Sequence, residues 1–106
     1  MAYAAYPHAS VSTRSHHATA FVVVEVVTEI SEAAHVRHAV SDCPDAGVLR
    51  CIPLPKGGRV RLQIRCPACE VPHLMHEVMS QTVAAEFGRT ATWADHLAHY
   101  QETRHA

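Results

Sequence analysis

Four potential metal ligands lie close together in the stretch RCPACEVPHLMH, which spans residues 65–76. Cys66 and Cys69 are separated by two residues, and His73 and His76 follow with the same spacing. Zinc prefers four ligands in a tetrahedron, drawn mainly from cysteine thiolates and histidine nitrogens. A Cys-x-x-Cys pair in a tight turn, which the intervening proline favours, directs both sulfurs toward one point. The stretch therefore predicts a zinc site.

The other two cysteines can be placed by the geometry of the hairpin that precedes this stretch. If the chain turns near Gly57, Cys43 returns to the same end of the hairpin as Cys66. Cys51 falls in mid-strand, about 10 Å away at about 3.3 Å per residue, and we expect it to be a small buried core residue. The preferred ligand set is Cys43, Cys66 and Cys69 with either His73 or His76. The alternative is the local set Cys66, Cys69, His73 and His76.

A strand that runs into Cys-Pro-Ala-Cys resembles the zinc-ribbon class of small zinc-binding domains. The resemblance covers roughly residues 43–69 and is partial, because a ribbon has two Cys-x-x-Cys pairs and this chain has one. It implies a structural zinc and contact with nucleic acid or with the transcription machinery.

Other chemistry is less well supported by the spacing. A thiol redox protein using Cys66 and Cys69 is an alternative, because a Cys-x-x-Cys that opens a helix can have a lowered thiol pKa. That interpretation expects a preceding βαβ arrangement, whereas hairpins are expected here. His96 and His99 form a second pair, expected to flank a helix rather than bind metal. No glycine-rich phosphate loop, HExxH or nucleophile motif occurs, which favours a non-catalytic protein.

Basic residues are concentrated in the hairpin that leads into the cysteine pair. Five of the nine lysines and arginines lie between Val48 and Cys66, with no acidic residue among them. Such a stripe could contact nucleic acid or an acidic protein surface. The alternative is a neutralised face, in which Glu25 and Glu29 on a neighbouring strand pair with these arginines. The candidate partner-binding residues are Arg50, Lys56, Arg59, Arg61 and Arg65.

The elements that position these residues follow from local patterns. AFVVVEVVTEI (20–30) is rich in β-branched residues and predicts a strand. A second strand is expected at 35–40, with a helical turn through 30–40 as the alternative. The pattern VLRCIPLP-KGG-RVRLQIRC predicts a hairpin. A helix is expected through 73–88, ending at Gly88, and a second helix after Thr92 as N-cap. The predicted fold is α+β, an antiparallel sheet of about four strands followed by two C-terminal helices.

Length and composition limit the class of protein. The chain has 106 residues, of which 48% are hydrophobic, and a formal net charge of −1. We expect a flexible tail over 1–18 and a single domain over 19–106. No apolar run is long enough to span a bilayer, and no secretory signal is recognised, which favours a cytoplasmic protein. We predict a zinc-stabilised binding or regulatory protein, with a protein-interaction adaptor as the alternative and a homodimer compatible with either.

Overall fold

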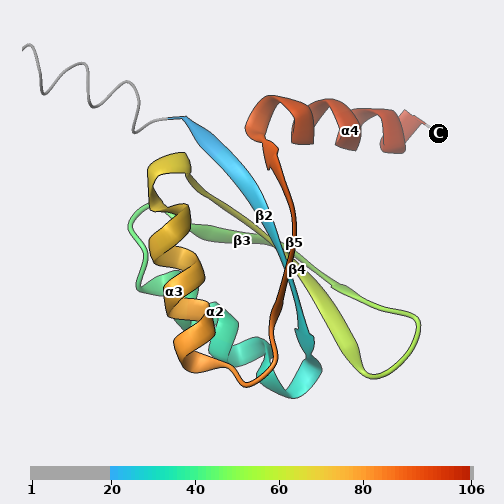
Figure 1. Ribbon diagram of the computed structural model, residues 1–106. Helices are drawn as coiled ribbons and strands as arrows, with labels where there is room; N and C mark the ends of the chain where they lie inside the picture. Colours follow the sequence, from blue (N-terminus) through green and yellow to red (C-terminus); the bar gives the residue numbers. More distant parts are fainter. Residues whose placement is uncertain (1–19, 106) are drawn as a thin grey trace, which may run out of the picture.

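The computed structural model describes residues 20–105, with side chains described as far as His99. The tail predicted over 1–18 lies outside the described residues. Four strands and three α-helices follow the order β-α-β-β-α-β-α (Figure 1). The strands are β2 (Phe21–Glu29), β3 (Gly47–Pro53), β4 (Arg59–Pro67) and β5 (Glu86–Thr92); the helices are α2 (Ala33–Ser41), α3 (Val71–Gln81) and α4 (Trp93–His105), with 3-10 turns η1 (Ile30–Glu32) and η2 (Ala68–Glu70).

The strands form one antiparallel sheet in the order β3-β4-β2-β5. The two strands at its centre, β2 and β4, pair along their whole length, from Phe21 opposite Pro67 to Glu29 opposite Arg59. Each outer strand has one register irregularity. In β3 it lies between Val48 and Arg50, and in β5 it lies opposite Glu25 of β2. This β-α-β-β-α-β order is the split βαβ arrangement of ferredoxin-like folds, which by itself implies no function.

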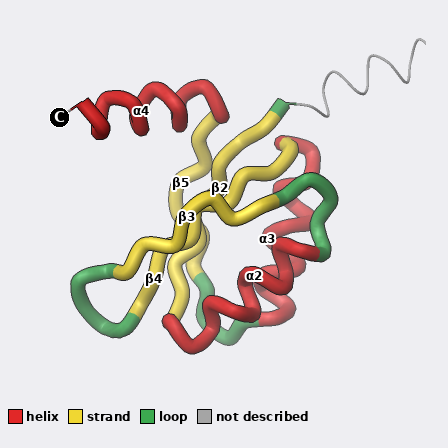
Figure 2. Tube along the Cα trace, turned by 180° about the vertical axis from the view of Figure 1, so that it is seen from behind, coloured by secondary structure: helices red, strands yellow, loops and turns green. Residues whose placement is uncertain are grey.

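Helices α2 and α3 cover one face of the sheet, and α4 projects on the opposite side (Figures 1 and 2). Alternate residues of the central strands, including Val24, Val26, Leu62 and Ile64, are buried beneath α2 and α3. The helices contribute buried side chains at helical spacing, namely Val36, Ala39 and Val40 from α2 and Leu74 and Val78 from α3. One layer of helices and one layer of sheet thus share a single core.

The sequence prediction of a strand at 35–40 is wrong, and the helical alternative for this segment is confirmed. Residues 33–41 form α2, because Val36, Ala39 and Val40 recur at i, i+3 and i+4 and together face the core. Glutamate and alanine near its start favour helix as well. The His38 side chain contacts Gln81 Oε1 of α3 at 2.8 Å, which joins the two helices.

The fourth strand lies instead at residues 86–92. Its first three residues fall in the segment predicted as one helix through 73–88, and the rest follow that segment. Helix α3 ends at Gln81, where Thr82 adopts an extended conformation and its hydroxyl donates to the Val78 carbonyl at 2.8 Å. Phe87 then packs against the core from β5 rather than from a helix. Gly88 is a strand residue, and its lack of a side chain makes room for Glu25, since a Cβ atom there would lie 3.3 Å from Glu25 Oε1.

Three local predictions are confirmed. The strand at 20–30 is observed as β2, and the hairpin turns at Lys56–Gly58, with positive φ angles at Gly57 (83°) and Gly58 (61°). The N-cap of α4 is also as expected, because the Asp95 amide donates to Thr92 Oγ1 at 3.0 Å. Over residues 20–105 the fold is therefore α+β with a four-stranded antiparallel sheet, and this part of the chain contains three α-helices rather than only two at its C-terminal end.

Candidate functional site

Two of the four cysteines are buried on the helical side of the sheet. Cys43, just after α2, is 4% exposed and Cys66, near the end of β4, is 0% exposed. Both belong to the core, and the Cys43 thiol contacts the Ala39 carbonyl at 3.5 Å. Cys69 is exposed on the 3-10 turn before α3. Cys51 is exposed on β3, so the prediction that it is a core residue is wrong; β3 is an outer strand that the helices do not cover there.

Burial and nearby negative charge favour the protonated form of both buried thiols. Burial raises the pKa of Cys66 to about 11, with further contributions from Cys43, Glu70 and Cys69. The pKa of Cys43 is raised by burial and then by Glu77, Glu70 and Asp42. Reactive thiols in redox proteins have lowered pKa values. The surroundings of Cys66 therefore do not favour the redox interpretation of Cys66 and Cys69.

The histidines of the predicted metal site have neighbours of their own. His73 lies between two carboxylates of its own segment, with Nδ1 3.3 Å from Glu70 Oε1 and Nε2 3.5 Å from Glu77 Oε2. His76 is exposed on α3. Within residues 20–105, no group of three or more histidine, cysteine, aspartate or glutamate side chains is placed to hold a metal ion. The zinc site at Cys43, Cys66, Cys69 and His73 or His76 stays a prediction.

The opposite face of the sheet has a different composition. We call it the open face, since α2 and α3 lie on the other side (Figures 1 and 2). Side chains alternate between the two faces along each strand, and the pairing register shows which residues of neighbouring strands lie on the same face. Its members are Phe21, Val23, Glu25, Val27 and Glu29 of β2, Arg59, Arg61, Gln63 and Arg65 of β4, Gly47, Arg50 and Ile52 of β3, and Glu86, Gly88, Arg89 and Ala91 of β5.

Part of the predicted basic stripe is neutralised within the open face. Arg61 Nε lies 3.8 Å from Glu25 Oε1, which confirms that Glu25 pairs with an arginine across the sheet. Arg59 lies 3.3 Å from Glu86 of β5, rather than pairing with Glu29. Both arginines remain 32–41% exposed in their side chains. Lys56 is exposed in the hairpin turn, and Arg50 lies on β3 opposite Gln63.

The guanidinium of Arg65 lies against two aromatic rings. Its guanidinium carbon lies 4.0 Å from the centre of the Phe21 ring and 4.9 Å from that of Trp93. Trp93 in turn stacks on His96, with ring centres 5.6 Å apart. This cluster was not predicted from sequence, because its members come from three distant elements, β2, β4 and α4. The alternation of β2, which puts Phe21 on the same face as Glu25, was the only signal for it.

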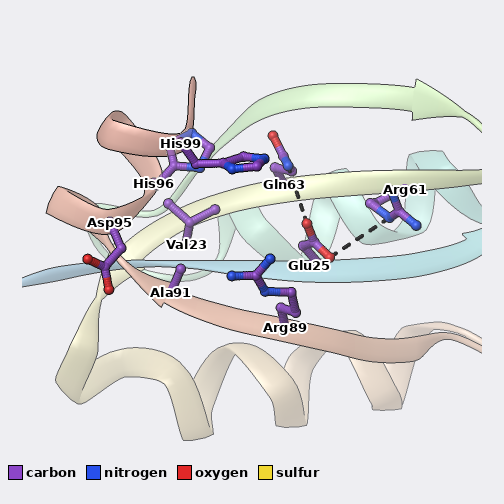
Figure 3. Close-up of a pocket in the computed structure, with 9 residues that line it drawn as sticks. All are labelled: Val23, Glu25, Arg61, Gln63, Arg89, Ala91, Asp95, His96 and His99. Atoms are coloured by element: carbon purple, nitrogen blue, oxygen red, sulfur yellow. Dashed lines mark hydrogen bonds and ion pairs between the residues drawn. The ribbon is translucent and has the colours of Figure 1, made fainter. Parts of the chain in front are cut away.

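A hollow of about 320 Å³ lies between α4 and the open face (Figure 3). Val23 and Ala91 contribute its apolar part, and charged or polar side chains from β2, β4, β5 and α4 contribute the rest. A second hollow, of about 340 Å³, is lined by Phe21, Arg65 and the start of β3. The first is lined by Val23, Glu25, Arg61, Gln63, Arg89, Ala91, Asp95, His96 and His99.

This arrangement combines cations with flat rings on an accessible surface. His96 and His99, which were expected only to flank a helix, line the first hollow together with arginines of β4 and β5. The hollow thus brings two arginines, two carboxylates and two imidazoles together around a small apolar surface.

Comparison of the chain with models of known protein families and with curated proteins finds no match. Among the described residues, no helix is long and apolar enough to cross a membrane.

Proposed function

We propose that the protein is a non-catalytic binding module that holds single-stranded nucleic acid on the open face of its sheet. The observation that carries this proposal is the composition of that face, where five arginines lie beside an aromatic cluster and two hollows. Proteins that bind single strands combine a basic surface for the phosphates with aromatic rings on which bases stack. The arginines are Arg50, Arg59, Arg61, Arg65 and Arg89.

The ion pairs on the open face do not prevent phosphate binding. Pairs between exposed side chains contribute little to stability, typically about 0–1 kcal/mol, so a phosphate can compete for the same guanidinium. Glu25 and Glu86 also hold the Arg61 and Arg59 side chains over the sheet, which reduces the entropy lost when a ligand binds. Arg89 is exposed and makes no ion pair within the described residues. A phosphate can therefore bind it without breaking an existing ion pair.

A titration of a labelled single-stranded oligonucleotide, followed by fluorescence anisotropy at several salt concentrations, tests the proposal. We expect saturable binding whose affinity falls steeply with salt, because phosphate contacts release counterions. Arg89→Glu should lower the affinity about tenfold and make the salt dependence shallower.

Arg37→Glu is a matched control with the same change in charge. Arg37 is exposed on α2, on the opposite side of the sheet. We expect this variant to bind the oligonucleotide nearly as well as the unmodified protein. Equal losses in the two variants, or no saturable binding, would contradict the proposal. Absence of oligonucleotide binding together with a nuclease-insensitive complex would favour an acidic protein partner instead.

A structural zinc held by Cys43, Cys66, Cys69 and either His73 or His76 is a separate proposal, supported by the Cys-x-x-Cys spacing of Cys66 and Cys69 and by the burial of Cys43 and Cys66 in one core. Because thiols must lose their protons to bind zinc, binding should release protons and weaken at low pH. Metal analysis of the untagged protein should find about one zinc per chain, lost in Cys66→Ser. Metal-free protein with unchanged stability in Cys43→Ser and Cys66→Ser would contradict it.

A further inference from the structure

We infer that the hollow beside α4 is a pocket for one guanine nucleotide unit. The inference rests on the proposed function, since it assigns a base preference to part of the same face. The hollow, about 320 Å³, is within the size range of small-ligand pockets, near its lower end, and it is open enough to admit one ring system (Figure 3). It is the part of the open face where four different elements place polar side chains around a small apolar surface.

One oxygen in the lining of the hollow, Gln63 Oε1, has no hydrogen-bond donor among the described residues. This oxygen is buried, whereas the amide nitrogen of the same side chain donates to Glu25 Oε2 at 3.3 Å. Figure 3 shows the amide nitrogen directed toward Glu25 and the oxygen turned away from it. A buried acceptor without a donor is unfavourable, so a ligand that supplies an N–H group there gains affinity.

Two carboxylates supply further acceptors around the hollow. The carboxylates of Glu25 and Asp95 both line it. Glu25 is fixed by Arg61 and Gln63, while Asp95 lies in the first turn of α4, where its backbone N–H donates to the capping hydroxyl of Thr92. Guanine presents two adjacent donors, N1–H and the N2 amino group, and a carboxylate can accept from both. Uracil has a single ring N–H between two carbonyls, and adenine has one amino group beside an acceptor.

The remainder of the nucleotide can contact an apolar surface and two cations in the hollow. Val23 and Ala91 offer an apolar surface on which a flat base can lie, and the imidazole of His96 stands beside it in a stack with Trp93. Arg61 and Arg89 enter from the two strands that flank β2, so a phosphate can reach a cation from either side of the base. Acceptors for the base and cations for the phosphate are thus present in one hollow.

The experiment compares guanosine, adenosine and uridine monophosphates by titration calorimetry with the full chain. It then compares an undecamer of uridines with the same RNA carrying one central guanosine, by anisotropy. We expect guanosine monophosphate to bind at least tenfold more tightly than uridine monophosphate. We expect the guanosine-containing RNA to bind several-fold more tightly than the all-uridine RNA.

Two variants separate recognition of the base from recognition of the phosphate. Gln63→Leu should abolish the preference for guanine, so that guanosine and uridine monophosphates bind this variant with equal affinity. Arg89→Gln should weaken all three mononucleotides by a similar factor, and this exposed position keeps the test valid if Gln63→Leu does not fold. Arg37→Gln should change neither the preference for guanine nor the affinity for the three mononucleotides.

The outcomes distinguish this inference from the proposed function. Salt-dependent binding of the oligonucleotides with equal affinity for all bases would overturn the guanine pocket and leave the proposed function standing. A guanine preference that survives in Gln63→Leu would overturn the pocket as well. Failure of both mononucleotides and oligonucleotides to bind would overturn both.

Discussion

Arg65 shows how the surroundings of a single residue decide what its charge can do. The alternation of RVRLQIR (59–65) correctly places Arg59, Arg61 and Arg65 on one face, because that pattern depends only on the pleat of the strand. The local sequence could not show that Phe21 and Trp93 both lie against the Arg65 guanidinium, since each belongs to a distant segment. The arginine stripe was thus predictable, and the aromatic cluster was not.

Replacing Arg65 should loosen the first turn of α4. We expect Arg65→Gln to lower the free energy of unfolding by about 1 kcal/mol, because two cation–π contacts are lost. Trp93 is the only tryptophan in the chain, so its fluorescence emission should shift to longer wavelength as the ring becomes more exposed. Arg61→Gln is the control, since Arg61 pairs with Glu25 and should leave the emission unchanged. An unshifted spectrum in Arg65→Gln would contradict the importance of these contacts.

The buried thiol of Cys66 predicts a dependence of stability on alkaline pH in the metal-free protein. Its pKa is about 11 in the fold, against 9.0 for an ordinary thiol. Between these values the unfolded chain releases the proton and the folded chain keeps it, so stability should be constant below about pH 9 and fall toward pH 11. The loss should be on the order of 2 kcal/mol.

Urea denaturation at pH 8, 9, 10 and 11 measures this effect. Cys66→Val keeps the side chain apolar and of similar size, and it removes the titrating group. We expect a shallower decline in this variant, with the remaining slope from Cys43, whose pKa is raised as well. Parallel curves for the two proteins would rule out Cys66 as the source.

At the scale of elements, segments with a strong local pattern were predicted and ambiguous segments were not. The β-branched run of β2 and the Gly57–Gly58 turn each admit essentially one structure. Residues 33–41 contain both β-branched and helix-favouring residues, and only the core contacts of Val36 and Val40 decide for helix. The short strand β5 has a glycine in its interior and gains its conformation from pairing with β2, which no local pattern can reveal.

The packing of α3 on the sheet should contribute strongly to stability. Leu74 is 0% exposed in the core, so Leu74→Ala should lower the free energy of unfolding by about 2–5 kcal/mol. Val83, just after α3, is 92% exposed, and Val83→Ala should change stability by less than about 0.5 kcal/mol. Chemical denaturation of both variants checks this contrast. Similar effects at the two positions would contradict the observed packing.

The start of α4 depends on the Thr92 hydroxyl. Removing it in Thr92→Ala leaves the Asp95 amide without its acceptor and should cost about 1 kcal/mol. Thr92→Ser keeps the hydroxyl and should restore most of the loss. Hydrogen exchange at the Asp95 amide should accelerate in the alanine variant only. Equal exchange rates in both variants would show that the cap does not hold this turn.

At the scale of the whole molecule, the two sides of the sheet have separate roles. One side is buried beneath α2 and α3 and provides the core, and the other carries the arginines, the aromatic cluster and both hollows. Alternation in β2 and β4 indicated the two faces from sequence. The direction of α4 could not be inferred, because it depends on where β5 ends relative to Arg65 and Phe21. The hollow beside α4 was therefore beyond reach from sequence alone.

The irregularities in the two outer strands have a consequence for how the molecules behave in a crowded solution. A straight outer strand offers a row of amide and carbonyl groups that a neighbouring chain can join to extend the sheet. In both β3 and β5 the register shifts partway along, which bends and twists the strand. Pro53 also removes an amide from β3. Growth into fibres by strand addition is thereby discouraged at either edge, and the molecules should stay separate at high concentration.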